Sequence, residues 1–72
     1  MDAEEIKSYN ETAEKCLKIT PTYPNFIGAI SCYDWIGNKG GLEHVLALAK
    51  ERRNITAIEA AEDALKKYGG AA

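Results

Sequence analysis

Residues 25–36 read NFIGAISCYDWI and decide the fold, because they form the most apolar and aromatic stretch of the chain. Phe26, Ile30 and Tyr33 recur at the i, i+4 and i+7 positions of a helix. The aromatic and β-branched content would also suit a strand, but a single strand would have nothing to pair with. A helix that is apolar on most faces belongs at the centre of a core or in an interface. We therefore predict a central helix over residues 25–36.

Three amphipathic helices are expected around this centre. Residues 2–19 place apolar side chains at helical spacing, with acidic residues at the start and lysines at the end, as the helix dipole favours. Residues 42–53 and 56–68 show the same periodicity. The second of these ranges opens with Thr56 and Glu59, which match the spacing of a capping box.

Turn-forming residues mark the boundaries of these helices. Pro21 and Pro24 break the chain after the first helix, since each lacks a backbone donor and pushes its predecessor toward extended geometry. Residues 37–41 read GNKGG and predict a tight turn. Gly69 is placed to close the last helix, and residues 69–72 are then a short tail.

The length of the chain, 72 residues, is near the lower size at which a domain folds unaided. We predict one all-α domain over residues 1–72, a compact three- to four-helix orthogonal bundle with the second helix as its hydrophobic centre. The formal net charge is −2, which excludes a generic polyanion binder, because non-specific affinity for nucleic acid comes from excess lysine and arginine.

The compartment is expected to be the cytoplasm. The N-terminus lacks the basic start and apolar run of a secretion signal, and no stretch approaches the roughly 18 apolar residues that span a bilayer. We therefore expect no membrane association. Cys16 and Cys32 match neither a redox nor a zinc spacing, so we expect reduced thiols that serve as small core residues.

Catalytic residues are not evident, and we predict no enzyme, no cofactor and no metal site. His44 is the single histidine, and its neighbour Glu43 points to a different face of the helix. His44 is therefore interpreted as a solvated surface residue. Glu59, Glu62 and Asp63 form an acidic patch, which we interpret as a solvated helix face.

The aromatic residues between positions 23 and 35 are the first candidate for a functional surface. Tyrosine and tryptophan dominate binding hot spots because they bury a large area at little entropic cost. At 100° per residue, Trp35 points about 160° away from Tyr33, so both do not easily face one core. We expect Trp35 and Tyr23 at the surface and name Tyr23, Trp35 and Tyr33 as candidate partner-binding residues. The favoured function is a small non-enzymatic protein-binding module, a regulator or inhibitor of a larger complex. A phage or mobile element is one candidate origin of the chain, and a second copy of the chain is one candidate partner.

The glycine turn is the alternative candidate. Backbone donors ahead of a helix, with a lysine beside them, suit a phosphate group. The string GNKG at residues 37–40 resembles the G-x-x-G loop of KH domains, although Glu43 stands where that pattern has an apolar residue. This alternative predicts a nucleic-acid or nucleotide-phosphate binder. Its candidate residues are Gly37, Asn38, Lys39, Gly40, Arg52 and Arg53.

Overall fold

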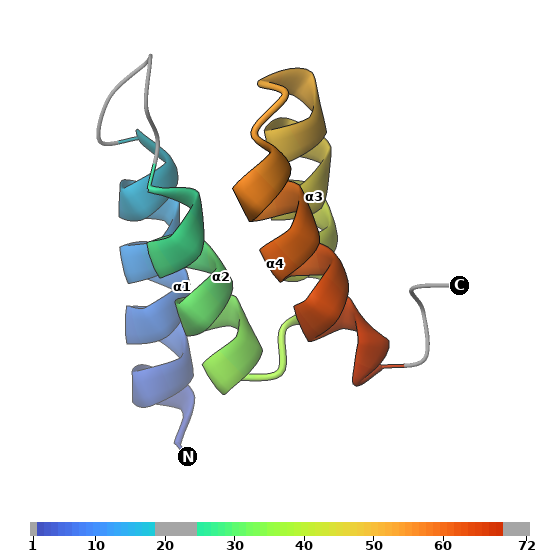
Figure 1. The fold of residues 1–72 in the computed structure, drawn as a ribbon. Helices are drawn as coiled ribbons and strands as arrows, with labels where there is room; N and C mark the ends of the chain where they lie inside the picture. The colour runs from blue at the N-terminus through green and yellow to red at the C-terminus, as the bar shows by residue number, and fades with distance from the viewer. Residues whose placement is uncertain (1, 19–24, 69–72) are drawn as a thin grey trace.

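The computed structural model describes residues 2–18 and 25–68, and these residues form four helices (Figure 1). In chain order they are α1 (Ala3–Lys18), α2 (Phe26–Trp35), α3 (Lys39–Glu51) and α4 (Ile55–Lys66). No strand occurs among the described residues, so the all-α prediction is confirmed and the strand alternative for residues 25–36 is wrong. Tyr23 and Gly69, which the sequence singled out, lie outside the described residues.

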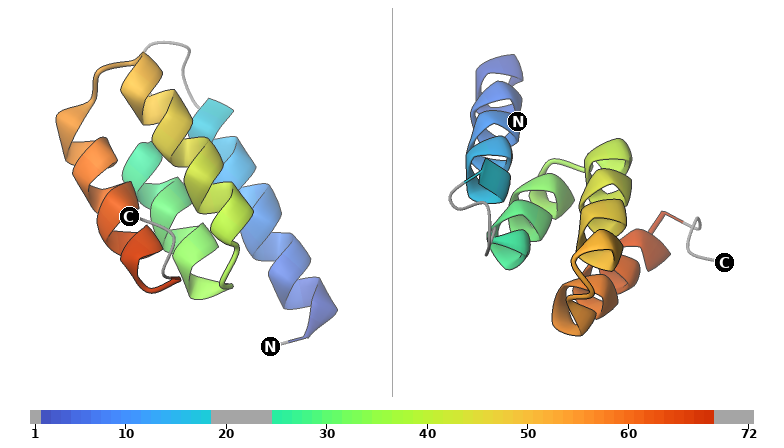
Figure 2. Two further views of the ribbon diagram at one scale, coloured as in Figure 1. Left: turned by 90° about the vertical axis from the view of Figure 1, so that its right-hand side faces the viewer. Right: turned by 90° about the horizontal axis from the view of Figure 1, so that it is seen from above.

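The four helices form two antiparallel hairpins, α1 with α2 and α3 with α4 (Figures 1 and 2). All four helices pack into one bundle, as the sequence predicted. The short connections from α2 to α3 and from α3 to α4 favour this arrangement, since a tight turn places successive helices side by side. Helix α2 packs against each of the other three, which confirms its position as the hydrophobic centre.

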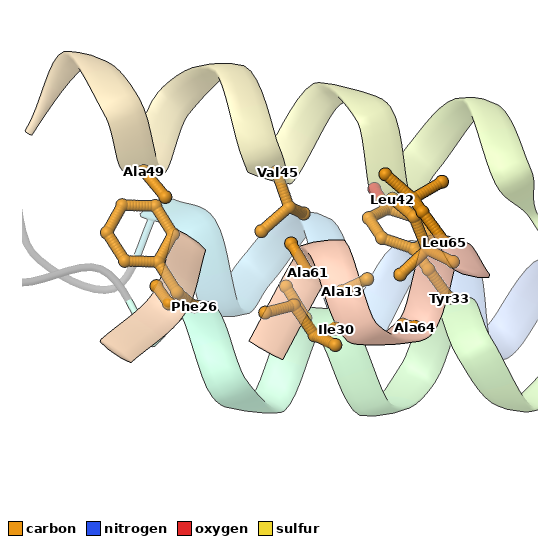
Figure 3. Packing of buried hydrophobic residues seen from close by; sticks show 12 residues of the cluster. Ala13, Phe26, Ile30, Tyr33, Leu42, Val45, Ala49, Ala61, Ala64 and Leu65 are labelled. Carbon is orange, nitrogen blue, oxygen red and sulfur yellow. The ribbon is translucent and has the colours of Figure 1, made fainter. Parts of the chain in front are cut away.

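The core lies between α2 and the hairpin of α3 and α4 (Figure 3). Phe26, Ile30 and Tyr33 of α2 point toward Leu42 and Val45 of α3 and toward the apolar face of α4. Small side chains fill the closest approaches between helices. The buried alanines are Ala13, Ala29, Ala49, Ala57, Ala61 and Ala64.

The turns that follow α2 and α3 have the same backbone geometry. After α2, Gly37 has a φ of 69°, and the Asn38 N–H donates to the Tyr33 carbonyl over 2.9 Å. After α3, Arg53 has a φ of 57°, and the Asn54 N–H donates to the Ala49 carbonyl over 3.0 Å. Both are Schellman endings, in which a left-handed residue lets the chain satisfy the last carbonyls of the helix.

Asparagine then starts the next helix in each case, and also at the start of α2. The side-chain Oδ1 atoms of Asn25, Asn38 and Asn54 accept hydrogen bonds from the backbone three residues ahead, at 2.9, 2.9 and 3.1 Å. An Asn cap of this kind satisfies an orphan donor of the first turn. The predicted capping box is therefore wrong, because Asn54 caps α4 and Thr56 lies inside the helix.

The third helix begins at Lys39, three residues before the predicted start, so the turn after α2 is shorter than the sequence suggested. Capping by Asn38 outweighs the low helix propensity of two glycines. Gly41 is there for a packing reason, since a Cβ atom at this position would lie 2.5 Å from the Tyr33 ring. The glycine lets α3 approach the aromatic side chain of α2.

The two cysteines are free thiols, half-buried against the core at the α1–α2 contact. The Cys16 Sγ atom lies 3.0 Å from the position that a Cβ atom on Gly28 would occupy. Burial raises the pKa of the Cys32 thiol above its ordinary value, and the neighbouring Cys16 adds to the increase. Both were expected as small core residues, and the structure places them against the core with partial exposure.

Candidate functional site

The outward face of α2 exposes an apolar stripe that the core does not cover. Ile27 is 48% exposed, Trp35 is 67% exposed, and the small side chain of Ser31 is exposed between them. These three residues follow one another at intervals of four and therefore share one face of the helix. We call them the α2 stripe. An indole exposed to this extent would normally be covered, because it is the largest apolar side chain available to a core or an interface.

A shallow, open hollow of about 380 Å³ lies between α2 and α4 and includes Ser31 of the stripe, and we call it the groove. Figures 1 and 2 show these two helices on the same side of the molecule, with α1 and α3 on the other. Two alanines of α4 and three charged residues are among the residues that line the groove. Its lining residues are Ile30, Ser31, Asp34, Ala60, Asp63, Ala64 and Lys67.

The charges at this groove are paired. Lys67 donates a hydrogen bond of 2.9 Å to the Asp34 carboxylate, and this bond and the negative charge of Asp34 raise the pKa of the Lys67 ammonium. Lys66 donates to Asp63 over 3.2 Å. Surface pairs of this kind add little stability. Their effect here is to leave each of the two groove carboxylates beside a lysine, so that the groove has little net charge.

Two of the three predicted partner-binding residues, Trp35 and Tyr33, lie within the described residues, and they do not share a surface. Trp35 lies at the surface as expected. Tyr33 is only 5% exposed and packs in the core against Gly41, so it offers almost no area to a partner. Burial raises the pKa of the Tyr33 hydroxyl, with a smaller contribution from Glu14. The sequence did not identify Ile27 and Ser31 as neighbours of Trp35, although their spacing of four residues was a sufficient signal.

The residues of the phosphate-binding alternative lie at the two ends of α3. Gly37, Asn38, Lys39 and Gly40 precede or open this helix of 13 residues, whereas Arg52 and Arg53 follow it. The two groups are therefore separated by about 18 Å of helix, and the structure does not combine them into one site. The Gly41 N–H, a donor of the first turn, is already satisfied by the Asn38 side chain.

Asn38 is also tied to another part of the molecule. Its Nδ2 atom donates a hydrogen bond of 2.9 Å to the Asn10 Oδ1 atom of α1. The side chain thus caps α3 and links the turn to α1 at the same time. These two bonds give Asn38 a structural role in the turn, while its role in binding phosphate stays a prediction.

A second hollow, of about 370 Å³, lies between α1 and α3 and brings together polar residues that the sequence left apart. His44 is exposed on α3, as expected, but it lines this hollow with residues of α1 and α2. Reading this from the sequence would have required knowing that α1 and α3 face the same side. The lining residues are Glu14, Leu17, Lys18, Tyr33, His44 and Leu48.

The acidic patch of α4 is exposed, as expected for a solvated helix face. Glu59, Glu62 and Asp63 border a shallow surface hollow together with Lys66, which pairs with Asp63. Within residues 2–18 and 25–68, no group of three or more metal-ligating side chains converges on one point. In the same part of the chain, none of the helices combines the length and the apolar character needed to cross a bilayer.

No family model matches this chain, and neither a curated protein nor a solved structure is significantly similar to it. The candidate site therefore depends on its own geometry. Among the described surfaces, the α2 stripe with the adjoining groove combines a large exposed aromatic side chain, a hollow and paired charges.

Proposed function

We propose that this chain is a small non-enzymatic protein-binding module that docks through the α2 stripe and the adjoining groove. The observation that carries the proposal is Trp35, which is 67% exposed on the helix that otherwise forms the centre of the core. Exposed tryptophan beside small residues is typical of binding hot spots, which bury one or two aromatic anchors in a pocket. A module of this size suits a regulator or inhibitor of a larger complex and, with reduced thiols, the cytoplasm.

The proposal is tested by comparing a substitution in the α2 stripe with a substitution at an exposed apolar residue elsewhere on the surface. Ile55 is 64% exposed at the start of α4 and does not line the groove, so it is a matched control for Trp35. The wild-type protein, Trp35→Ala and Ile55→Ala would be immobilised at equal density and exposed to the same cell extract. A protein retained by the wild type and by Ile55→Ala, but not by Trp35→Ala, would then be purified and its affinity measured.

The expected result is a loss of affinity of at least tenfold for Trp35→Ala, because truncating a hot-spot tryptophan removes most of its buried area. Ile55→Ala should bind within about twofold of the wild type, as peripheral contacts usually do. If the three forms retain the same proteins with the same affinities, the α2 stripe is not the docking surface.

The nucleic-acid alternative receives no specific support from the geometry, since its residues lie at opposite ends of α3. This alternative stays a prediction. Measuring binding to an oligonucleotide pool at low and high salt would test it. Lys39→Glu is the variant of choice, because Lys39 is exposed in the first turn of α3. Binding that this variant abolishes and Trp35→Ala leaves intact would favour the alternative over the protein-binding module.

A further inference from the structure

Cys16 and Cys32 belong to different helices and lie where α1 packs against α2. Both are free thiols, half-buried against the core and still partly exposed to solvent. We propose that these two thiols form a redox switch, in which an oxidant joins them in a reversible disulfide that ties α1 to the central helix. The switch does not depend on the α2 stripe or on the partner that the stripe binds.

The contact between Cys16 and Gly28 shows how close the two thiols lie. The Cys16 Sγ atom is 3.0 Å from the position that a Cβ atom on Gly28 would occupy. Cys32 follows Gly28 by four residues, so the two share one face of α2 with Cβ positions about 5–6 Å apart. Together these distances limit the separation of the Cys16 Sγ and Cys32 Cβ atoms to about 9 Å.

The electrostatic interaction between the thiols agrees with this placement. Burial raises the pKa of the Cys32 thiol, and the negative charge of a Cys16 thiolate raises it further. A like charge has this effect when it lies nearby. The two sulfur atoms are therefore neighbours across the α1–α2 contact.

A disulfide requires a closer approach, which the packing of α1 allows. Bonded cysteines place their Cβ atoms about 3.5–4.5 Å apart. Among the helices, the backbone of α1 packs against α2 alone, so a shift of α1 along α2 leaves the contacts among α2, α3 and α4 in place. Gly28 has no side chain to obstruct this shift, although the hydrogen bond between Asn38 and Asn10 breaks in it. A movement of no more than about one helical turn brings the sulfur atoms to bonding distance.

Hydrogen peroxide, a small two-electron oxidant of thiols, balances the reaction. One sulfur attacks a peroxide oxygen as its thiolate, the O–O bond breaks, and hydroxide leaves a sulfenic acid behind. The other sulfur then attacks the sulfenic sulfur as its thiolate, so that the S–S bond forms, the S–O bond breaks and a second hydroxide leaves. The two hydroxides take up the two thiol protons. Each cysteine thus loses one electron, and the peroxide is reduced to water.

Mass spectrometry of the oxidised protein tests for the bond. The folded protein would be treated with equimolar hydrogen peroxide at low protein concentration, which disfavours bonds between chains. The intact mass should fall by that of two hydrogen atoms. Trypsin cleaves after Lys15, Lys18 and Lys39, so the bond should join the fragments of residues 16–18 and 19–39. A thiol reductant should restore the original mass, as a switch requires.

Urea unfolding of the same samples tests whether the bond fits the native fold. A disulfide that closes a loop of about 15 residues restricts the unfolded chain and so favours the folded one. The oxidised protein should have a folding equilibrium constant about ten- to a hundredfold larger than that of the reduced protein. The difference should vanish when reductant is added.

Two variants serve as controls. Cys32→Ser removes one sulfur and should show neither the loss of mass nor the gain in stability. A double variant, Ser31→Cys with Cys32→Ser, keeps two thiols but moves the second by one residue to an exposed position of α2. Adjacent residues of a helix point to different faces, so this thiol should not pair with Cys16.

Three outcomes would overturn the inference. Thiols that stay reduced, or that gain oxygen as sulfinic acids without forming the bond, do not lie close enough to pair. A bond that forms equally well in the double variant reflects the flexibility of the chain instead of the position of Cys32. A bond that lowers the stability of the protein, or leaves it unchanged, does not fit between α1 and α2 in the native fold.

Discussion

Replacing Arg53 by glycine should stabilise the protein, although it removes a charged side chain and touches no core residue. Arg53 has a φ of 57°, in the left-handed region that side chains with a Cβ atom rarely adopt. Gly37 occupies the equivalent position in the preceding turn. The chain thus contains two copies of one Schellman ending, with glycine in the first and arginine in the second.

The magnitude follows from two opposing contributions. A left-handed conformation costs an L-residue about 1–2 kcal/mol, which glycine avoids. Glycine in turn loses more backbone entropy on folding, about 0.4–1 kcal/mol relative to a residue with a Cβ atom. We therefore expect Arg53→Gly to raise the free energy of unfolding by about 0.5–1 kcal/mol and Tm by about 2–8 °C for a domain of this size.

Urea unfolding followed by circular dichroism measures this change, and two variants serve as controls. Arg52→Gly alters the neighbouring residue, whose φ is −86°, so glycine has no conformational advantage there and should lower the stability. Gly37→Ala places a Cβ atom at the other left-handed position and should cost about 1 kcal/mol. An Arg53→Gly protein that is no more stable than the wild type, beside a destabilised Gly37→Ala, would refute the equivalence of the two turns.

Four further substitutions and one alkylation experiment test other parts of the structure. Gly41→Ala should lower the free energy of unfolding by about 2–4 kcal/mol, because the alanine methyl group would overlap the Tyr33 ring and force α3 away from α2. Thermal melting measures this change, and an unchanged Tm would mean that the two helices are not in contact there. Asn54→Ala should cost about 1 kcal/mol in urea unfolding through loss of the α4 cap, whereas Thr56→Ala should cost much less; the reverse order would restore the capping box. Because burial raises the pKa of the Cys32 thiol, Cys32 should react with iodoacetamide more slowly at pH 8 than an unstructured cysteine peptide. By linkage, the stability that the protonated Cys32 thiol contributes is present below the pKa of the unfolded thiol and is lost as the pH rises through the folded pKa. Cys32→Ala should therefore flatten the alkaline part of the plot of unfolding free energy against pH. An unaltered plot would count against the burial of this thiol.

The sequence predicted the helices well because their periodicity is a property of each segment alone. The spacing of Phe26, Ile30 and Tyr33 is enough to place α2 at the centre of the core. The angle between Tyr33 and Trp35 correctly separated a buried from an exposed aromatic residue. Both inferences use only the geometry of a single helix, which sequence order fixes.

Helix boundaries and the candidate site were harder, because they depend on contacts between segments. The start of α3 at Lys39 results from the Asn38 cap and from the fit of Gly41 against Tyr33, and the second of these is a tertiary contact. The groove required knowing that Ser31 of α2 lies beside Ala64 of α4. The left-handed Arg53 carries no local signal, since arginine is not a residue that favours this conformation.

The peripheral position of α1 has a consequence for how the native protein opens. The backbone of α1 packs against α2 alone among the helices, and Ala13 is its one fully buried residue within the described range. Detaching this helix would leave the contacts among α2, α3 and α4 in place. Its amide hydrogens should therefore exchange with solvent through a partial opening, well before those of α2, and the link between Asn10 and Asn38 would break in that step. The protein would then behave as a cooperative unit of three helices with a fourth that detaches and returns. A ligand that contacts α1 would shift the equilibrium between attached and detached α1 without having to stabilise the whole molecule.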